Sequence, residues 1–253
     1  MKFSSKLILL IIVFYVFISI KTFSQSAEQV VDRYLKAIGG VSKWNSINSK
    51  IEKALYITFP SKNSAVFGNV KIDTLKATKK FKRPSKIFYS LLRNGDSISL
   101  IMCNNNKVFW TQNKNGQLSV HSKEEGEDFV KTSMMGFADV LLKKDTELEY
   151  LGKEKLCEEE FYVLRVKGAG WYLSSKWYFD KETGLLFCAS PIDSSIKRYT
   201  IFKNYEKIDD VVLFHFLEEV YDDQWNLESR YIFINRKVNV VIDDSEFDIP
   251  HSN

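Results

Sequence analysis

Alternation of apolar and polar positions runs through most of the chain. In residues 157–168, CEEEFYVLRVKG, the side chains of Tyr162, Leu164 and Val166 form one apolar face of an extended segment. This period of two is typical of a strand with one covered face and one wet face. From about residue 48 onward, similar runs are separated by Asn-, Gly- and Ser-containing turn signals. The pattern predicts a mainly β (α+β) fold with one curved antiparallel sheet of about ten or eleven strands.

Two segments have the period of a helix instead. Ser26 and Gln29 form a capping box in front of apolar residues at helical spacing, and Gly39 follows as a helix-ending residue. Residues 128–143 repeat apolar side chains near the same spacing, with acidic residues before them and lysines at the end. We therefore expect an N-terminal helix and one mid-chain helix, which are available to cover the concave face of the sheet.

The first 24 residues have the features of a secretory signal peptide. Lys2 and Lys6 precede an apolar run from Leu7 to Ile20, which is shorter than the roughly 20 residues that a membrane-spanning helix needs. Cleavage after Ser24 would leave residues 25–253 as a single exported domain. An uncleaved membrane anchor is the alternative interpretation.

Charge and cysteine content limit the classes of function. The formal net charge of +4 falls to about +1 without the lysines of the signal segment, which is not the strongly basic balance of a nucleic-acid-binding protein. The three cysteines, Cys103, Cys157 and Cys188, are an odd number for an oxidising compartment. One disulfide is possible, but the sequence does not indicate which pair would form it.

The sequence contains no recognisable catalytic or metal-binding motif. The histidines, His121, His215 and His251, are far apart and have no partner at ligand spacing, so we expect no metal site. No nucleophile elbow or phosphate loop is present, and we expect neither catalysis nor a cofactor. A carboxylate pair assembled from distant strands would still permit an envelope hydrolase, which is the least favoured function.

One basic run and two acidic runs stand out in the sequence. The basic run at residues 76–86, KATKKFKRPSK, is either an edge strand protected by lysines and a proline, or a patch that meets anionic lipid or an acidic partner surface. The acidic runs at residues 157–161 and 241–248 are expected to be solvated loops or tail.

Aromatic residues make up 14% of the chain, which is high for a sheet protein. They can form an ordinary core, or they can line an apolar cavity as in barrels that enclose a ligand. The mid-chain MMGF, residues 134–137, combines adaptable methionines with a glycine, which suits a surface for varied apolar ligands. Composition alone does not separate a core from a binding surface.

Two segments carry a resemblance to a known family. Residues 81–112, FKRPSKIFYSLLRNGDSISLIMCNNNKVFWTQ, and residues 233–250, FINRKVNVVIDDSEFDIP, resemble the periplasmic lipoprotein carrier (LolA-type) superfamily. The segments AIGG, residues 37–40, and DKETGLL, residues 180–186, are also similar to outer-membrane lipoprotein-sorting-like envelope proteins.

The resemblance implies an incomplete half-barrel whose concave face binds acyl chains under a helical lid. In that family the arginine of a Lys-Arg-Pro motif holds the lid closed by bonding to lid carbonyls, a role that the resemblance places on Arg83. The turn at Gly39 and Gly40 would lead into the sheet, with Trp44 plugging the end of the barrel. The residues expected to contact an apolar ligand are Trp110, Met134, Met135, Phe137, Val140, Leu141, Leu164 and Trp177.

The function expected from the sequence is therefore non-catalytic binding in the periplasm. The ligand would be a lipid or the acyl chains of a lipoprotein, with possible transport of lipoproteins to the outer membrane and an envelope transport or acceptor protein as a further partner. A monomer is expected. The alternative is an envelope protein-interaction or sensor module with the same fold and a filled core.

Overall fold

The computed structural model describes residues 25–60, 72–93, 97–132, 136–168, 174–192 and 197–250. The predicted signal segment lies outside these ranges. None of the described helices is long and apolar enough to cross a membrane.

The described chain forms one large antiparallel sheet that does not close. The strands are β1 (Ser49–Thr58), β2 (Asp73–Lys82), β3 (Lys86–Leu92), β4 (Ile98–Asn104), β5 (Phe109–Asn113), β6 (Leu118–His121), β7 (Glu147–Leu156), β8 (Glu159–Lys167), β9 (Ser174–Asp180), β10 (Leu186–Pro191), β11 (Arg198–Ile208), β12 (Val212–Asp222) and β13 (Leu227–Val238). Their order in the sheet is β6-β5-β4-β3-β2-β1-β13-β12-β11-β10-β9-β8-β7. The predicted mainly β, half-barrel fold class is confirmed, with thirteen described strands instead of about ten or eleven.

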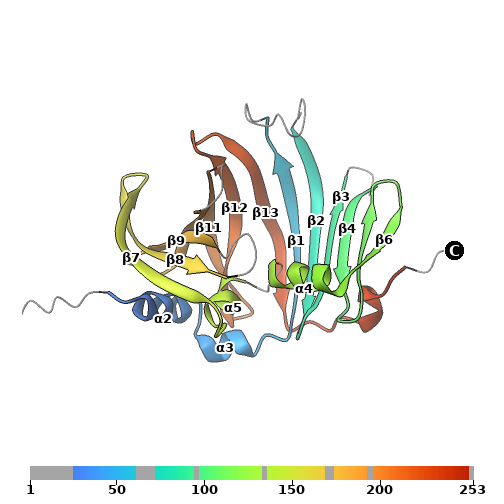
Figure 1. The fold of residues 1–253 in the computed structure, drawn as a ribbon, viewed down its shortest axis with the longest axis horizontal. Helices are drawn as coiled ribbons and strands as arrows, with labels where there is room; N and C mark the ends of the chain where they lie inside the picture. The colour runs from blue at the N-terminus through green and yellow to red at the C-terminus, as the bar shows by residue number, and fades with distance from the viewer. Residues whose placement is uncertain are drawn as a thin grey trace, which may run out of the picture.

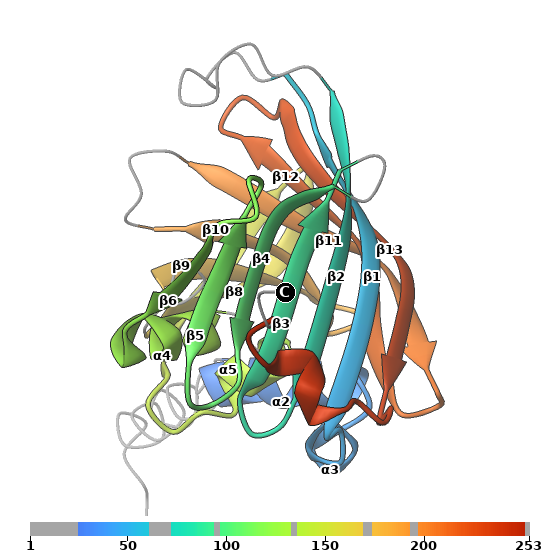
Figure 2. The same cartoon turned by 90° about the vertical axis from the view of Figure 1, so that its right-hand side faces the viewer.

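Helices lie mainly on one face of this sheet. They are α2 (Ala27–Ala37), α3 (Val41–Asn45), α4 (Lys123–Thr132) and α5 (Phe137–Leu141), and a short 3₁₀ helix, η1 (Asp244–Phe247), follows the last strand. The strands curve around α4 and α5, whereas η1 lies on the opposite side of β3 (Figures 1 and 2). We call the face toward α4 and α5 the inner face, and the face toward η1 the outer face.

The two predicted helices have different outcomes. The N-terminal helix α2 is confirmed, including the reciprocal capping bonds of Ser26 and Gln29. The mid-chain segment contains two short helices instead of one helix over residues 128–143. The backbone of Gly136 is extended and lies so close to Trp44 that an added Cβ would be 2.7 Å from the indole Cη2. This close approach explains why a glycine precedes α5.

Apolar residues are buried on both faces of the sheet. On the inner face, residues of α2, α3 and α5 pack with Leu164, Trp177 and Phe202 into the largest core cluster. On the outer face, the C-terminal segment contributes Phe247, which is fully buried, to a second cluster. Residues 240–249 therefore belong to the folded domain, as a cover for an apolar outer face that would otherwise meet water.

This packing predicts that Phe247→Ala lowers the free energy of unfolding by about 3–5 kcal/mol, because a fully buried ring is replaced by a cavity. Urea-induced unfolding monitored by tryptophan fluorescence measures the change. Val241→Ala, at a fully exposed position of the same segment, should change stability by less than about 0.5 kcal/mol. Equal, small effects of both substitutions would show that the segment does not contribute to the fold.

Candidate functional site

Arg83 connects the turn after β2 with the start of α5. Its Nε donates a hydrogen bond to the Ile47 carbonyl at 2.7 Å, and its Nη2 lies 3.3 Å from Asp139 Oδ1 in α5. The backbone N–H of Arg83 also donates to the Asn48 carbonyl at 2.8 Å. The sequence predicts a contact between Arg83 and lid carbonyls. In the structure the bond to α5 goes to a carboxylate, and the bond to a carbonyl goes to the segment before β1.

The same carboxylate accepts a second hydrogen bond. Trp44 Nε1, in α3, donates to Asp139 Oδ1 at 2.8 Å. The Trp44 side chain is 2% exposed, and its ring lies against Phe214, with 5.3 Å between the ring centroids. Asp139 thus joins α5 to the bottom of the barrel through two donors from different segments. We call Arg83, Trp44 and Asp139 the latch.

The side of α5 that faces the sheet is apolar. Phe137 meets Trp177 and Phe202 edge-on, at centroid distances of 5.2 and 4.6 Å. Val140 and Leu141 are buried, and both belong to the same cluster as Leu164 and Trp177. Five of the predicted ligand contacts are therefore brought together beneath or within α5.

The other predicted ligand contacts are not part of this group. Trp110 is buried on the outer face, where its Nε1 donates to the Phe247 carbonyl at 3.3 Å. Its strand neighbour Phe109 points to the inner face and stacks on Phe129 of α4. Because successive strand residues face opposite sides, a shift of one position separates Trp110 from the inner face. Met134 and Met135 lie outside the described residues.

The inner face also carries charges that sequence reasoning did not single out. Glu52 on β1 is 5% exposed and lies 2.8 Å from Lys50 Nζ and 2.7 Å from Arg236 Nε. The Arg236 Nε–H does not point along the short contact to Glu52, so this contact is an ion pair without an aligned hydrogen bond. Lys79 and Glu218 lie close enough to act on this group electrostatically. We call Lys50, Glu52, Lys79, Glu218 and Arg236 the inner charge cluster.

Register explains how four strands bring these charges together. Glu52 on β1 is directly opposite Arg236 on β13 and opposite Lys79 on β2. His215 Nε2 and Glu218 Oε1 lie 2.5 Å apart and share a hydrogen bond. The backbone carbonyl of His215 accepts a hydrogen bond from Arg236 Nη1. Aromatic rings enclose the group, with Arg236 Cζ 3.5 Å from the centroid of Phe233. The alternating charges in β1 were the signal for this cluster, but alternation alone does not tell which face a polar residue occupies.

Burial and mutual attraction shift the pKa values of this cluster in opposing ways. Burial by itself would raise the pKa of Glu52, but the charges of Arg236, Lys50 and Lys79 outweigh it and lower the pKa to about 2. Burial lowers the pKa of Lys50 to about 8 against the opposing charge of Glu52. Burial and Arg236 lower the pKa of His215 despite the contact with Glu218. At neutral pH Glu52 and Lys50 are charged, and His215 is neutral.

Three tyrosines lie beside the cluster on the inner face. The Tyr89 and Tyr231 hydroxyls are 3.0 Å apart, and the rings of Tyr56 and Tyr231 stack with 4.4 Å between centroids. Tyr89 is directly opposite Lys79 in the sheet, and Tyr231 is opposite Glu218. All three tyrosines are half-buried. They combine flat apolar surface with hydroxyl donors next to the charges.

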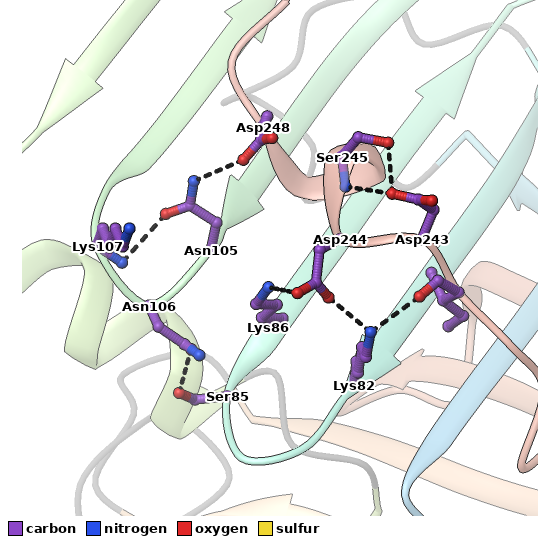
Figure 3. A network of polar contacts seen from close by, with 11 residues as sticks. Lys82, Ser85, Lys86, Asn105, Asn106, Lys107, Asp243, Asp244, Ser245 and Asp248 are labelled. Atoms are coloured by element: carbon purple, nitrogen blue, oxygen red, sulfur yellow. Dashed lines mark hydrogen bonds and ion pairs between the residues drawn. The ribbon is translucent and has the colours of Figure 1, made fainter.

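On the outer face, the basic run and the acidic C-terminal run pair with each other. Asp244 Oδ1 accepts from Lys82 Nζ at 2.6 Å, and Asp244 Oδ2 lies 2.9 Å from Lys86 Nζ (Figure 3). Lys80 pairs with Glu246 in the same segment. The interpretation of the basic run as an edge strand is wrong, because β2 lies between β1 and β3.

In residues 241–248 the acidic side chains are exposed, as expected, but the segment is not a free tail, since Ile242 and Phe247 are buried. The three cysteines are free, with Cys103 and Cys188 buried and Cys157 exposed. Among the described residues, no group of three His, Cys, Asp or Glu side chains is arranged to hold a metal ion.

Comparison with known proteins identifies the fold. No protein-family model matches the sequence, and no curated protein matches it. A LolA superfamily protein from Nitrosomonas europaea is similar in structure, with a TM-score of 0.59, 11% identity, and coverage of 88% of this chain and 98% of that chain. A DUF1329 family protein from Desulfovibrio piger has a TM-score of 0.56 and 13% identity over 89% of this chain and 98% of that chain.

A putative outer membrane lipoprotein-sorting protein domain from Vibrio parahaemolyticus is also similar. Its TM-score is 0.54, with 10% identity over 86% of this chain and 97% of that chain. The resemblance inferred from residues 81–112 and 233–250 is thus confirmed at the level of the fold. The chain has a LolA-type fold.

The inner charge cluster predicts that Glu52→Gln lowers the free energy of unfolding at neutral pH by about 3–5 kcal/mol, because Lys50 and Arg236 are left buried without their carboxylate. Joint replacement of Lys50, Glu52 and Arg236 by Met, Leu and Met should cost far less, since no buried charge of the ion pairs remains. Chemical denaturation measures both variants.

The pH dependence has a defined sign. The pKa of Glu52 is lower in the folded state than the ordinary glutamate value of 4.5, so its stabilisation is present above about pH 4.5 and is lost as the pH falls toward 2. Glu52→Gln should lose less stability over this window than the unmodified protein. An identical decline in both proteins would contradict the assignment.

Proposed function

We propose that the protein is exported to the periplasm and binds an acyl chain of a lipid or a lipidated protein beneath α5. The observation that carries this proposal is the latch, in which one carboxylate of α5 receives hydrogen bonds from Trp44 and Arg83. A short amphipathic helix that is attached at one polar point and covers an apolar surface is suited to act as a lid. Catalysis and cofactors have no part in this function.

Opening of the lid would break polar contacts at one end and expose apolar surface along the helix. Hydrogen bonds that involve a charged group contribute about 1.5–3 kcal/mol each. An acyl chain recovers about 0.8 kcal/mol for each buried CH₂ group. A chain that places several methylenes against Trp177 and Leu164 would therefore offset the loss of the latch. Phe137, Val140 and Leu141 would pack on the chain from the other side.

In this proposal α5 is a closed lid. The inner-face cluster beneath α5 is tightly filled, with Leu164 and Trp177 fully buried. Ligand binding thus requires α5 to move as a unit, and the latch sets the cost of that movement. The partner would be a lipid or the acyl chains of a lipoprotein, delivered or received by an envelope protein, and the carrier would act as a monomer.

A protein-interaction module is the second candidate function. The filled inner core favours it, and so does the edge strand β6, where Val120 is 59% exposed. An edge strand with exposed apolar side chains offers unpaired backbone groups to a partner strand. An envelope hydrolase has less support, because the inner-face carboxylates Glu52 and Glu218 are engaged by Lys50, Arg236 and His215.

The lid proposal predicts that protein purified from the periplasm carries lipid, and that Arg83→Leu exchanges it faster. Removal of one charged hydrogen bond from the latch should raise the exchange rate of a fluorescent acyl ligand by about tenfold or more. Native mass spectrometry with lipid extraction detects the bound lipid, and stopped-flow fluorescence measures the exchange.

Arg93→Leu is the matched control, because Arg93 pairs with Asp73 on an exposed part of the sheet away from α5. It should leave exchange unchanged. Absence of lipid from the purified protein, together with no binding of added acyl ligand, would rule out the proposed function. Equal exchange rates for Arg83→Leu and Arg93→Leu would rule out the latch.

A further inference from the structure

We infer that the hairpin between β12 and β13 is a glycan-binding site, in which the indole of Trp225 stacks on the apolar face of a sugar ring. The site is separate from the apolar surface beneath α5 and does not depend on the proposed function. Three features carry the inference: the backbone conformation of Trp225, the aromatic rings that support its indole, and the polar side chains beside it.

The β12–β13 hairpin has a tryptophan at a position that usually holds a glycine. The Trp225 N–H donates to the Asp222 carbonyl at 3.1 Å, and the Asp222 N–H donates to the Asn226 carbonyl at 3.0 Å. This pattern is a turn followed by a residue in the left-handed region, and Trp225 has a φ of 62°. A bulky side chain is unfavourable in this conformation.

A second hairpin of the same chain has the usual glycine. Between β5 and β6, Gly116 N–H donates to the Asn113 carbonyl at 2.9 Å, and Asn113 N–H donates to the Gln117 carbonyl at 3.1 Å. Gly116 has a φ of 78°, close to that of Trp225. The two turns therefore have the same backbone, and this backbone does not itself require a tryptophan.

Asp222 fixes the turn that carries Trp225. Asp222 is 1% exposed, and its Oδ1 accepts from the backbone N–H groups of Gln224 and Asn226 at 2.9 and 2.8 Å. Its Oδ2 accepts from Asn226 Nδ2 at 2.9 Å. The hydrogen bonds from Asn226 and Gln224 lower the pKa of Asp222, so the carboxylate is charged at neutral pH. A turn held in this way presents Trp225 in one orientation.

Aromatic rings support one face of the Trp225 indole. Tyr199 stacks on it, with 4.7 Å between ring centroids and an interplanar angle of 13°. Tyr221 lies beside it at 5.8 Å, and the Tyr221 hydroxyl donates to Glu219 Oε2 at 2.9 Å. Lys203 Nζ donates to the same Glu219 oxygen at 2.8 Å. The indole therefore rests on a fixed base.

The rest of the indole is open to solvent and has polar neighbours. Trp225 is 41% exposed although Tyr199 covers one of its faces. Asp223 and Gln224 before it, and Asn226 after it, are exposed. Their carboxylate and amide groups are suited to pair with hydroxyl groups. The hairpin thus combines a flat aromatic platform with hydrogen-bonding groups at its rim.

A sugar ring has the same combination of groups. A pyranose with equatorial hydroxyls carries its C–H hydrogens on its faces, and these hydrogens meet the negative face of an aromatic ring. Its hydroxyls lie around the rim, where the hairpin has Asp223, Gln224 and Asn226. A membrane surface fits less well, because insertion of Trp225 would bring these polar side chains out of water.

The site is remote from the lid. Leu213, at the start of β12, donates its N–H to the Ile38 carbonyl after α2 at 2.9 Å. The hairpin is at the other end of β12, away from α2 and α5 (Figure 1). Tyr199 and Tyr221 belong to an apolar cluster that is separate from the core beneath α5. A glycan at Trp225 would therefore not compete with an acyl chain under the lid.

The test measures binding of chitotriose, a β-1,4-linked trimer of N-acetylglucosamine with equatorial ring substituents. We expect a Kd in about the millimolar range by isothermal titration calorimetry, as for a small contact area. Saturation-transfer difference NMR should show the largest transfer to the axial ring protons. Trp225→Gly should raise the Kd by about tenfold or more, because one stacking platform corresponds to a factor of this size.

Trp225→Gly also separates binding from folding. Glycine suits the left-handed backbone of this turn, so relief of that conformation offsets the lost ring contacts. The melting temperature should stay within about 4 °C of that of the unmodified protein. A loss of binding at unchanged stability is the expected result.

Gly116→Trp in the Trp225→Gly protein is the matched control. It places an indole at the same position of the β5–β6 turn, where an added Cβ meets open space. The strand pair beside that turn is Gln112 and Leu118, whereas the pair beside Trp225 is Tyr221 and Leu227. Without the supporting tyrosines, this variant should not regain chitotriose binding.

Three outcomes would overturn the inference. The first is no binding of chitotriose to the unmodified protein at about ten times the expected Kd. The second is an equal Kd for the unmodified protein and Trp225→Gly. The third is recovery of binding through Gly116→Trp, because any exposed indole would then suffice. If Trp225→Gly instead abolished binding to phosphatidylglycerol vesicles and chitotriose bound neither protein, the hairpin would be a membrane contact.

Discussion

A broad antiparallel sheet that curves but does not close must fill its inner face with something other than a second sheet. Among the described residues the helices available to cover it are few: one eleven-residue helix, α2, and three shorter ones. The apolar half of the inner face, next to β7–β11, is covered by α2 and α5. The other half, formed by β1, β2, β13 and β12, is filled largely by charged and aromatic side chains.

Filling an interior with charges is an unusual solution for stability alone. A well-packed apolar core of similar volume is generally at least as stable as a buried ion-pair network. The cluster around Glu52 therefore adds no more to stability than an apolar core of the same volume would add. Its position beside the half-buried tyrosines and next to α5 makes the inner face amphipathic along its length, with a polar region and an apolar region in one continuous surface.

The outer face of the sheet is covered in a different way. There the apolar patch of β3–β5 is covered by the chain itself, through Phe247 and Ile242. The acidic residues of the same segment neutralise the lysines of β2 and β3 (Figure 3). As a result, the basic run is not an open patch for an acidic partner. In the proposed function the ligand would bind on the inner face, and in the alternative function a partner would bind at the edge strand β6.

Local patterns in the sequence determined the elements. The period-two alternation around Tyr162 and the capping box of Ser26 were sufficient to predict strands and the N-terminal helix, because both depend on interactions within a few residues. Short motifs such as the Lys-Arg-Pro segment at Arg83 indicated the fold, which structural similarity confirms. The prediction of a single helix over residues 128–143 failed where a distant residue, Trp44, required a glycine at position 136.

Only the tertiary structure decided which side chains share a surface. Trp110 lies on the outer face and Phe109 on the inner face, although either could be assigned to the core from sequence. Glu52, Arg236 and Lys79 come from three strands, two of them more than 150 residues apart, and their register makes them one cluster. The physical reason is that a strand residue changes face with a shift of one position, so sheet register, which is set by long-range pairing, determines what is buried together.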